Sequence, residues 1–116
     1  MREAQSDVTI EDINIQLEDA RAIIREADAL DRLFNNPDFN MVIREGYFKN
    51  EPARLVEMKA TPAMSSEASQ TVILKQIDGI GALQQYFNAR FLTGDMARDA
   101  IFDGEAQIDE ISEESY

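Results

Sequence analysis

Two residue types that commonly carry catalysis or bind metals are missing from this chain of 116 residues, which has no cysteine and no histidine. Without cysteine, the chain has no disulfide bonds and no thiol chemistry. Without histidine, it lacks the commonest general base and the commonest transition-metal ligand. We therefore expect no catalytic residues, no metal site and no cofactor, and we do not expect the protein to be an enzyme.

Long hydrophobic runs are also missing, since no stretch reaches the roughly 18 apolar residues that a transmembrane helix needs. Residues 1–9 lack the apolar stretch of a signal peptide and are expected to form a frayed N-terminus. Hydrophobic residues nevertheless make up 44% of the chain, which is enough for a folded domain. No membrane partner is expected, and the predicted compartment is the cytoplasm or a particle assembled in it.

Basic residues are scarce, because 11 Lys and Arg stand against 23 Asp and Glu, for a net charge of −12. Nucleic-acid binding relies on Lys and Arg to neutralise phosphates, so direct contact with nucleic acid is not expected. The charge fits a solvated acidic surface or one that meets a basic partner. Beyond Phe102 no basic residue occurs, and residues 103–116 are predicted to be a solvated acidic C-terminal segment.

The spacing of apolar residues predicts helices throughout the first half of the chain. From Ile10 onward, apolar residues alternate at intervals of three and four, which predicts a helix over 10–35 with Thr9 as its N-cap. Asn36-Pro37 predicts the start of a second helix, because Asn caps well and Pro suits the first helical position. A third helix is expected over 51–60, although it could form one kinked helix with the second.

The second half of the chain predicts two further helices after the loop that begins at Thr61-Pro62. The first is expected over 66–92 and the second over 95–110, with a break at Thr93-Gly94-Asp95. No strand pattern occurs. The predicted fold over residues 10–102 is all-α: an antiparallel helical hairpin or bundle, with two long helices joined by a corner of short helices.

Two short patterns invite a chemical interpretation. Gly79-Ile80-Gly81 resembles part of a phosphate-binding loop, but the third glycine and the preceding strand are missing, so close helix packing is favoured. Asp95, Asp99 and Asp103 could place three carboxylates on one helical face. Their spacing is not that of a calcium loop, and a solvated acidic face is the favoured interpretation.

The second helix is rich in aromatic residues, and we predict that it forms the corner where a partner binds. Phe39 is expected to face the core, whereas Phe48 lies about 100° from Tyr47 on an ideal α-helix and is expected to be an exposed anchor. Gly46 would allow another backbone to approach closely. The predicted partner-binding residues are therefore Gly46, Tyr47 and Phe48.

Residues 32–39 (RLFNNPDF), 42–48 (VIREGYF) and 77–83 (IDGIGAL) together resemble small acidic helical proteins of tailed bacteriophages, encoded among head and neck structural genes. The resemblance implies a virion protein that is present in the host cytoplasm during assembly. Its implied partners are further copies of itself, as a homo-oligomer, and a capsid, portal or neck protein. Two alternatives remain open: an acidic inhibitor or DNA-mimicking regulator of a host protein, and an assembly chaperone or scaffold.

Overall fold

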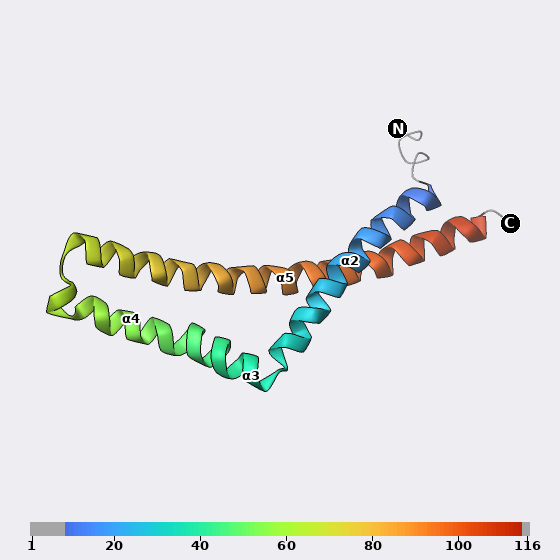
Figure 1. The fold of residues 1–116 in the computed structure, drawn as a ribbon. Coiled ribbons are helices and arrows are strands. Elements are labelled where there is room, and N and C mark those ends of the chain that lie inside the picture. The colour runs from blue at the N-terminus through green and yellow to red at the C-terminus, as the bar shows by residue number, and fades with distance from the viewer. Residues whose placement is uncertain (1–8, 115–116) are drawn as a thin grey trace. The chain divides into compact units, whose positions relative to one another are not determined.

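The computed structural model describes residues 9–114, which form helices joined by short turns (Figure 1). No strand occurs among these residues, so the prediction of an all-α fold is confirmed. Most of the segment 1–9 that was expected to fray lies outside the described residues. The elements in chain order are α2 (Ile10–Phe34), α3 (Pro37–Phe39), the π-helix η1 (Asn40–Asn50), α4 (Glu51–Ala60), the 3₁₀ turn η2 (Pro62–Met64) and α5 (Glu67–Glu114).

Capping side chains determine where α2 and α3 begin. The hydroxyl of Thr9 accepts a hydrogen bond from the Asp12 amide at 3.1 Å, and the Asp12 carboxylate accepts one from the Thr9 amide at 3.2 Å. The side-chain oxygen of Asn36 accepts from the amides of Asp38 and Phe39 at 2.8 and 3.2 Å. Each cap satisfies amides that have no partner within the helix, so both predicted N-caps are confirmed.

The segment from Pro37 to Ala60 is one continuous run of helical backbone, which was the alternative considered for the second and third predicted helices. The amide of Glu51 donates to the carbonyl of Gly46, five residues back, as in a π-helix. Pro52 follows immediately. It has no amide hydrogen to donate, and its ring crowds the carbonyl four residues back, so an ordinary α-helical ladder cannot pass through it.

The predicted break at Thr93-Gly94-Asp95 is wrong, because α5 is a single helix of 48 residues. Gly94 is buried, and a Cβ atom built on it would lie 2.5 Å from the Cβ of Ala27. A glycine at this position allows α2 and α5 to approach each other closely, and it does not end the helix. The same helix continues through the predicted acidic segment 103–116 as far as Glu114.

The chain divides into two compact units, and the boundaries fall inside α2 and α5. The first unit comprises the described residues of Met1–Ala29 and Arg90–Tyr116. Its core contains Ile13, Leu17, Ala20, Ala27 and Ala97. The Arg21 guanidinium lies 3.8 Å from the Glu105 carboxylate, and that of Arg98 lies 2.5 Å from Asp28. Within this unit, later residues of α2 thus meet earlier residues of α5.

The second unit is Leu30–Ala89. Leu55 of α4 and Ile73 and Ile80 of α5 are buried together, with Tyr47, Phe48, Met58, Met64 and Ile77 packed around them. The side-chain amide of Gln70 donates to the carbonyls of Lys59 and Met64 at 3.0 and 2.7 Å, which fastens the turn η2 to the start of α5. A small apolar core and this polar tie therefore hold the helices of the second unit together.

Candidate protein-interaction surfaces

Four phenylalanines of the second unit form one aromatic cluster: Phe34, Phe39, Phe48 and Phe87. The ring of Phe87 lies 5.5, 6.1 and 5.9 Å from those of Phe34, Phe39 and Phe48, measured between centroids. The three contacts are edge-on, a favourable geometry for aromatic quadrupoles. Phe39, which was expected to face the core, is half-buried and contacts the rings of Phe34 and Phe87. The central position of Phe87 could not be predicted from its spacing alone.

The expectation that Phe48 is exposed is wrong. Its side chain is half-buried against the core of the second unit, and its ring lies 5.9 Å from those of Tyr47 and Phe87. The prediction rests on the rotation of 100° per residue in an ideal α-helix, but these residues form a π-helix. Hydrogen bonds in η1 span five residues, so each residue turns by a smaller angle and Phe48 comes round toward the core.

Gly46 does not bring another helix close to the corner. A Cβ built on it would meet only the carbonyl oxygen of Met41 in its own helix, at 3.3 Å. Tyr47 is half-buried beside Phe48. Binding of a partner by Gly46, Tyr47 and Phe48 thus remains a prediction, and their surroundings equally fit a structural role in the corner.

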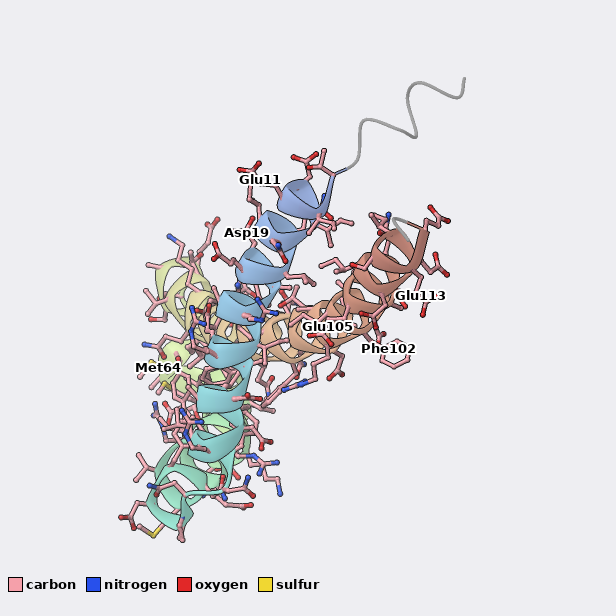
Figure 2. The ribbon with its side chains drawn as sticks, turned by 90° about the vertical axis from the view of Figure 1, so that its right-hand side faces the viewer. Glu11, Asp19, Met64, Phe102, Glu105 and Glu113 are labelled. Carbon is pink, nitrogen blue, oxygen red and sulfur yellow. The ribbon has the colours of Figure 1, made fainter. Side chains whose placement is uncertain are left out.

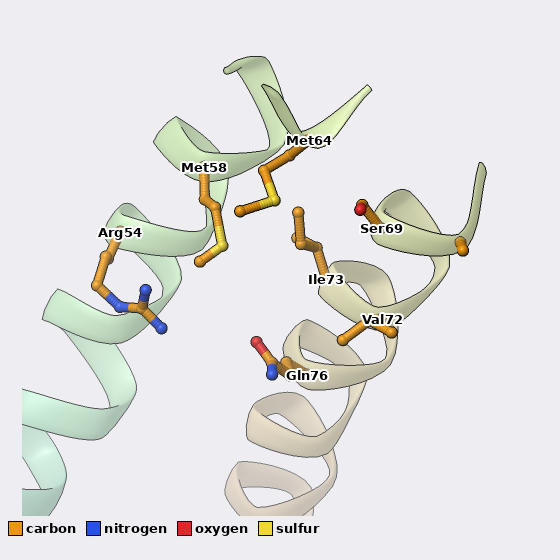
Figure 3. Close-up of a pocket in the computed structure, with 8 residues that line it drawn as sticks. Arg54, Met58, Met64, Ser69, Val72, Ile73 and Gln76 are labelled. Atoms are coloured by element: carbon orange, nitrogen blue, oxygen red, sulfur yellow. The ribbon is translucent and has the colours of Figure 1, made fainter. Parts of the chain in front are cut away.

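A pocket of about 360 Å³ opens between α4, η2 and the start of α5 (Figure 3). Met58, Met64 and Ile73 form its apolar lining, and Val72 at its edge is 55% exposed. Methionine side chains are flexible and polarisable, and they adapt to apolar partners of different shapes. The pocket could not be predicted from the sequence, because its lining residues come from both sides of the loop at Thr61-Pro62.

Arg54 lies at the rim of this pocket and is held by Glu51, one turn earlier in α4. Its Nε donates to the Glu51 carboxylate at 3.1 Å, and its Nη2 donates to the other carboxylate oxygen. The hydrogen bond from Arg54 lowers the pKa of Glu51 below its usual value, and the same bond raises the pKa of Arg54. The guanidinium therefore stays charged and oriented at the edge of an apolar hollow.

The two short patterns singled out in the sequence have different outcomes. Ile80 is a core residue, but a Cβ on Gly79 or Gly81 would meet nothing within 4 Å, so the expected close helix packing at these glycines is wrong. Asp95 pairs with Arg98 at 3.0 Å. Within residues 9–114, no three carboxylates, including Asp95, Asp99 and Asp103, are grouped so that they could hold a metal ion.

The charge of the chain is divided unevenly between the two units. The described part of the first unit holds 14 carboxylate and four arginine side chains, for a formal charge of −10, whereas the second unit has −1. Glu11 and Asp19 on α2 and Glu105 and Glu113 on α5 illustrate this concentration (Figure 2). Spacing along the sequence did not reveal this division, because the first unit combines the two ends of the chain.

Comparison with known protein families, curated proteins and solved structures finds no match to this chain. No helix within residues 9–114 is long and apolar enough to span a lipid bilayer. A function can therefore be proposed only from the chain's own surfaces and from the resemblance of residues 32–39, 42–48 and 77–83.

Proposed function

We propose that this protein is a bacteriophage virion structural protein, or a head or neck assembly protein, that acts through helix-mediated protein contacts and not through catalysis. The observation that carries the contact role is a set of large apolar side chains exposed on the helices of the second unit. They are Leu33, Met41, Val42, Val56, Val72, Leu74 and Tyr86. They give the helices of this unit apolar surface that a second protein could cover, with Val72 at the edge of an apolar pocket. The phage origin is supported by the sequence resemblance.

The proposed occupant of the pocket at Met58, Met64 and Val72 is a second copy of the chain. The second unit has a formal charge of only −1, so two copies can meet there with little electrostatic repulsion. Two first units repel strongly, because the described part of each has a charge of −10. The antiparallel order of contacts within the first unit supports the helical hairpin or bundle expected for the protein. A homo-oligomer formed through this pocket would leave the acidic helices free for other partners, such as a capsid, portal or neck protein.

Light scattering on the purified chain tests the self-contact. Val72→Glu places a charge at the edge of the pocket and should convert an oligomer into a monomer. Ala53→Glu is the control, since Ala53 is exposed on α4, does not line the pocket and does not belong to the exposed apolar set above. A monomeric wild-type protein at tens of micromolar, or equal effects of the two substitutions, would contradict a self-contact at the pocket.

Mass spectrometry of purified particles tests the virion role. We expect to detect the chain in finished particles, both inside the host cytoplasm and after their release. The Val72→Glu variant should be incorporated in smaller amounts. If the protein is abundant during assembly but missing from finished particles, the chaperone or scaffold alternative is the better one.

The concentration of charge in the first unit favours one second candidate, an acidic inhibitor or DNA-mimicking regulator of a host protein. Such a protein would displace a host nucleic-acid enzyme from DNA, and a competition assay with DNA measures this directly. Arg21, Arg90 and Arg98 interleave with the carboxylates and pair with them, an arrangement that differs from the uninterrupted negative charge of a DNA backbone.

A further inference from the structure

An apolar groove runs along one side of the helix pair in the first unit. Two hollows of about 400 and 240 Å³ share Gln16 and Ala100 in their linings and therefore adjoin. The buried side chains of Ala20 and Ala97 lie at the bottom of the larger hollow. Because these residues are small, the surface is hollowed where α2 and α5 meet.

Each helix contributes one row of residues to the groove, at intervals of three and four. Such intervals keep a row on one side of an α-helix. The rows are Ile13, Gln16, Ala20 and Ile23 on α2, and Thr93, Met96, Ala100, Asp103 and Gln107 on α5. The row on α5 extends over 14 residue steps, or about 21 Å at the rise of an α-helix. The groove is therefore long enough for about four turns of another helix.

The larger of the two hollows exposes large apolar side chains. Met96 is 62% exposed and Ile23 is 40% exposed, and both line the larger hollow. Leu92, 61% exposed, lies one turn before Met96 on α5 and extends the apolar surface. These side chains could bury substantial apolar area against a partner, which makes this side of the helix pair suitable for docking.

The charged residues that line the groove are all acidic. They are Asp19 on α2 and Asp103 on α5, and no Lys or Arg belongs to either lining. Arg21 pairs with Glu105, Arg98 with Asp28, and Arg90 lies 3.9 Å from Glu26. Three of the four arginines in the described part of this unit are thus engaged with its own carboxylates, and the fourth, Arg25, shares a neighbouring hollow with Asp19. A cationic partner would add the positive charge that these linings lack.

We propose that this groove binds a basic amphipathic helix of another protein. An apolar stripe on that helix would cover Ile23 and Met96, and Lys or Arg on its flanks would reach Asp19 and Asp103. This is the helix-in-groove mode of recognition, strengthened by complementary charge. A second copy of the chain is a poor occupant, because it brings a net charge of −12 to a surface that is already acidic. The inference goes beyond the proposed function and does not depend on a virion location.

Fluorescence anisotropy with synthetic peptides tests the proposal on the full chain. The probe is a helical peptide of about 18 residues, long enough to cover the groove, with Leu on one face and Lys on both flanks. One control peptide has Glu in place of Lys, and another scrambles the same composition so that no apolar face forms. We expect only the Lys peptide with an intact apolar face to bind tightly, with an affinity that falls as salt is added.

Two matched pairs of protein variants locate the binding surface. Ala100→Lys fills the groove with a long cationic side chain, and Phe102→Lys makes the same charge change at a 75% exposed residue outside it. We expect Ala100→Lys to weaken binding about tenfold and Phe102→Lys to change it less than about twofold. Asp19→Asn with Asp103→Asn should weaken binding more than Asp109→Asn with Glu110→Gln, a pair that removes the same charge away from the groove. Circular dichroism melting curves confirm that each variant is folded.

Each other result overturns the proposal. Equal binding of the scrambled peptide would show attraction by net charge alone, without a groove. Equal loss in both variant pairs would place the contact elsewhere on the acidic unit. If the Lys peptide does not bind while Ala100→Lys abolishes self-association of the chain, the occupant of the groove is a second copy. If Ala100→Lys instead abolishes displacement of a DNA-binding protein from DNA, with no peptide bound, the groove serves the DNA-mimic alternative.

Discussion

The five glycines of this chain, all on helices, differ in what surrounds them. A Cβ on Gly94 would clash with Ala27, and one on Gly104 would lie 2.7 Å from a methyl group of Leu17. A Cβ on Gly79 or Gly81 would meet nothing within 4 Å. Glycine lowers helix stability relative to alanine by about 1 kcal/mol wherever it stands, so only its neighbours decide whether replacing it is favourable. Gly94 and Gly79 therefore differ in one respect: Gly94 lies against α2, and Gly79 has open space beside it.

Gly94→Ala and Gly79→Ala are predicted to change stability in opposite directions. Gly79→Ala should raise the free energy of unfolding by about 1 kcal/mol, because it gains helix propensity without a clash. Gly94→Ala should lower it by about 1–3 kcal/mol, since the new methyl group forces α2 and α5 apart. Urea denaturation followed by circular dichroism measures both values. An equal gain in stability for both variants would show that α2 and α5 are not in close contact at Gly94.

Phe87 is predicted to be the aromatic residue on which the second unit depends most. Phe87→Ala removes three edge-on ring contacts and should lower the free energy of unfolding by about 3 kcal/mol. Phe102→Ala is the matched control, and its effect should stay within about 0.5 kcal/mol because its ring is 75% exposed. Phe48→Ala should also destabilise, because its side chain is half-buried. If Phe48→Ala weakens partner binding and leaves the melting curve unchanged, Phe48 acts as a binding anchor and not as a core residue.

At the scale of the element, local chemistry determines the ends of the short helices, and Pro52 coincides with a change in their hydrogen bonding. Asn36 begins α3, and Thr61-Pro62 ends α4. Between these signals the chain changes from π-helix to α-helix at Asn50-Glu51, just before Pro52. The wider turn of η1 alters which side chains share a face, and this moves Phe48 to the core.

Asn36→Ala is predicted to lower the free energy of unfolding by about 1 kcal/mol. The substitution leaves the amides of Asp38 and Phe39 without their side-chain acceptor at the start of α3. Asn88→Ala makes the same chemical change at an exposed position inside α5, where alanine is the better helix former, and should be neutral or slightly stabilising. Thermal melting of the two variants side by side checks the difference, and a loss at Asn88 equal to that at Asn36 would argue against the cap.

At the scale of the whole molecule, charge is the property in which the two units differ most. The described part of the first unit has a formal charge of −10 and contains a few exposed ion pairs between α2 and α5, such as Arg21–Glu105. Exposed ion pairs contribute little to stability, whereas repulsion acts among all 14 carboxylates of the described part of this unit. The second unit is almost neutral and is held by its apolar core.

Added salt is therefore predicted to raise the melting temperature of the protein. Screening weakens both the ion pairs and the repulsion, but repulsion dominates where carboxylates outnumber arginines so strongly. Calorimetry between about 10 and 200 mM sodium chloride, a range over which the Debye length falls from about 30 Å to below 10 Å, measures the effect. A melting temperature that falls with salt would mean that the ion pairs stabilise the first unit more than the repulsion weakens it.

The sequence by itself determined the fold class and the positions where local chemistry acts. Apolar spacing predicted α2 almost to the residue, and the signals at Thr9, Asn36-Pro37 and Thr61-Pro62 predicted helix starts and stops that the structure contains. These features could be predicted because each depends on residues within one or two helical turns of each other.

Only the tertiary structure decided the features that depend on residues distant in the chain. The sequence around Gly94 predicts a helix break, but in the structure this glycine lies against Ala27, which is 67 positions earlier in the chain. The groove between α2 and α5 and the gathering of the charge in one unit arise because the two ends of the chain fold together. Helix propensity and capping act locally, whereas close packing and the electrostatic field are sums over neighbours that the fold alone brings together.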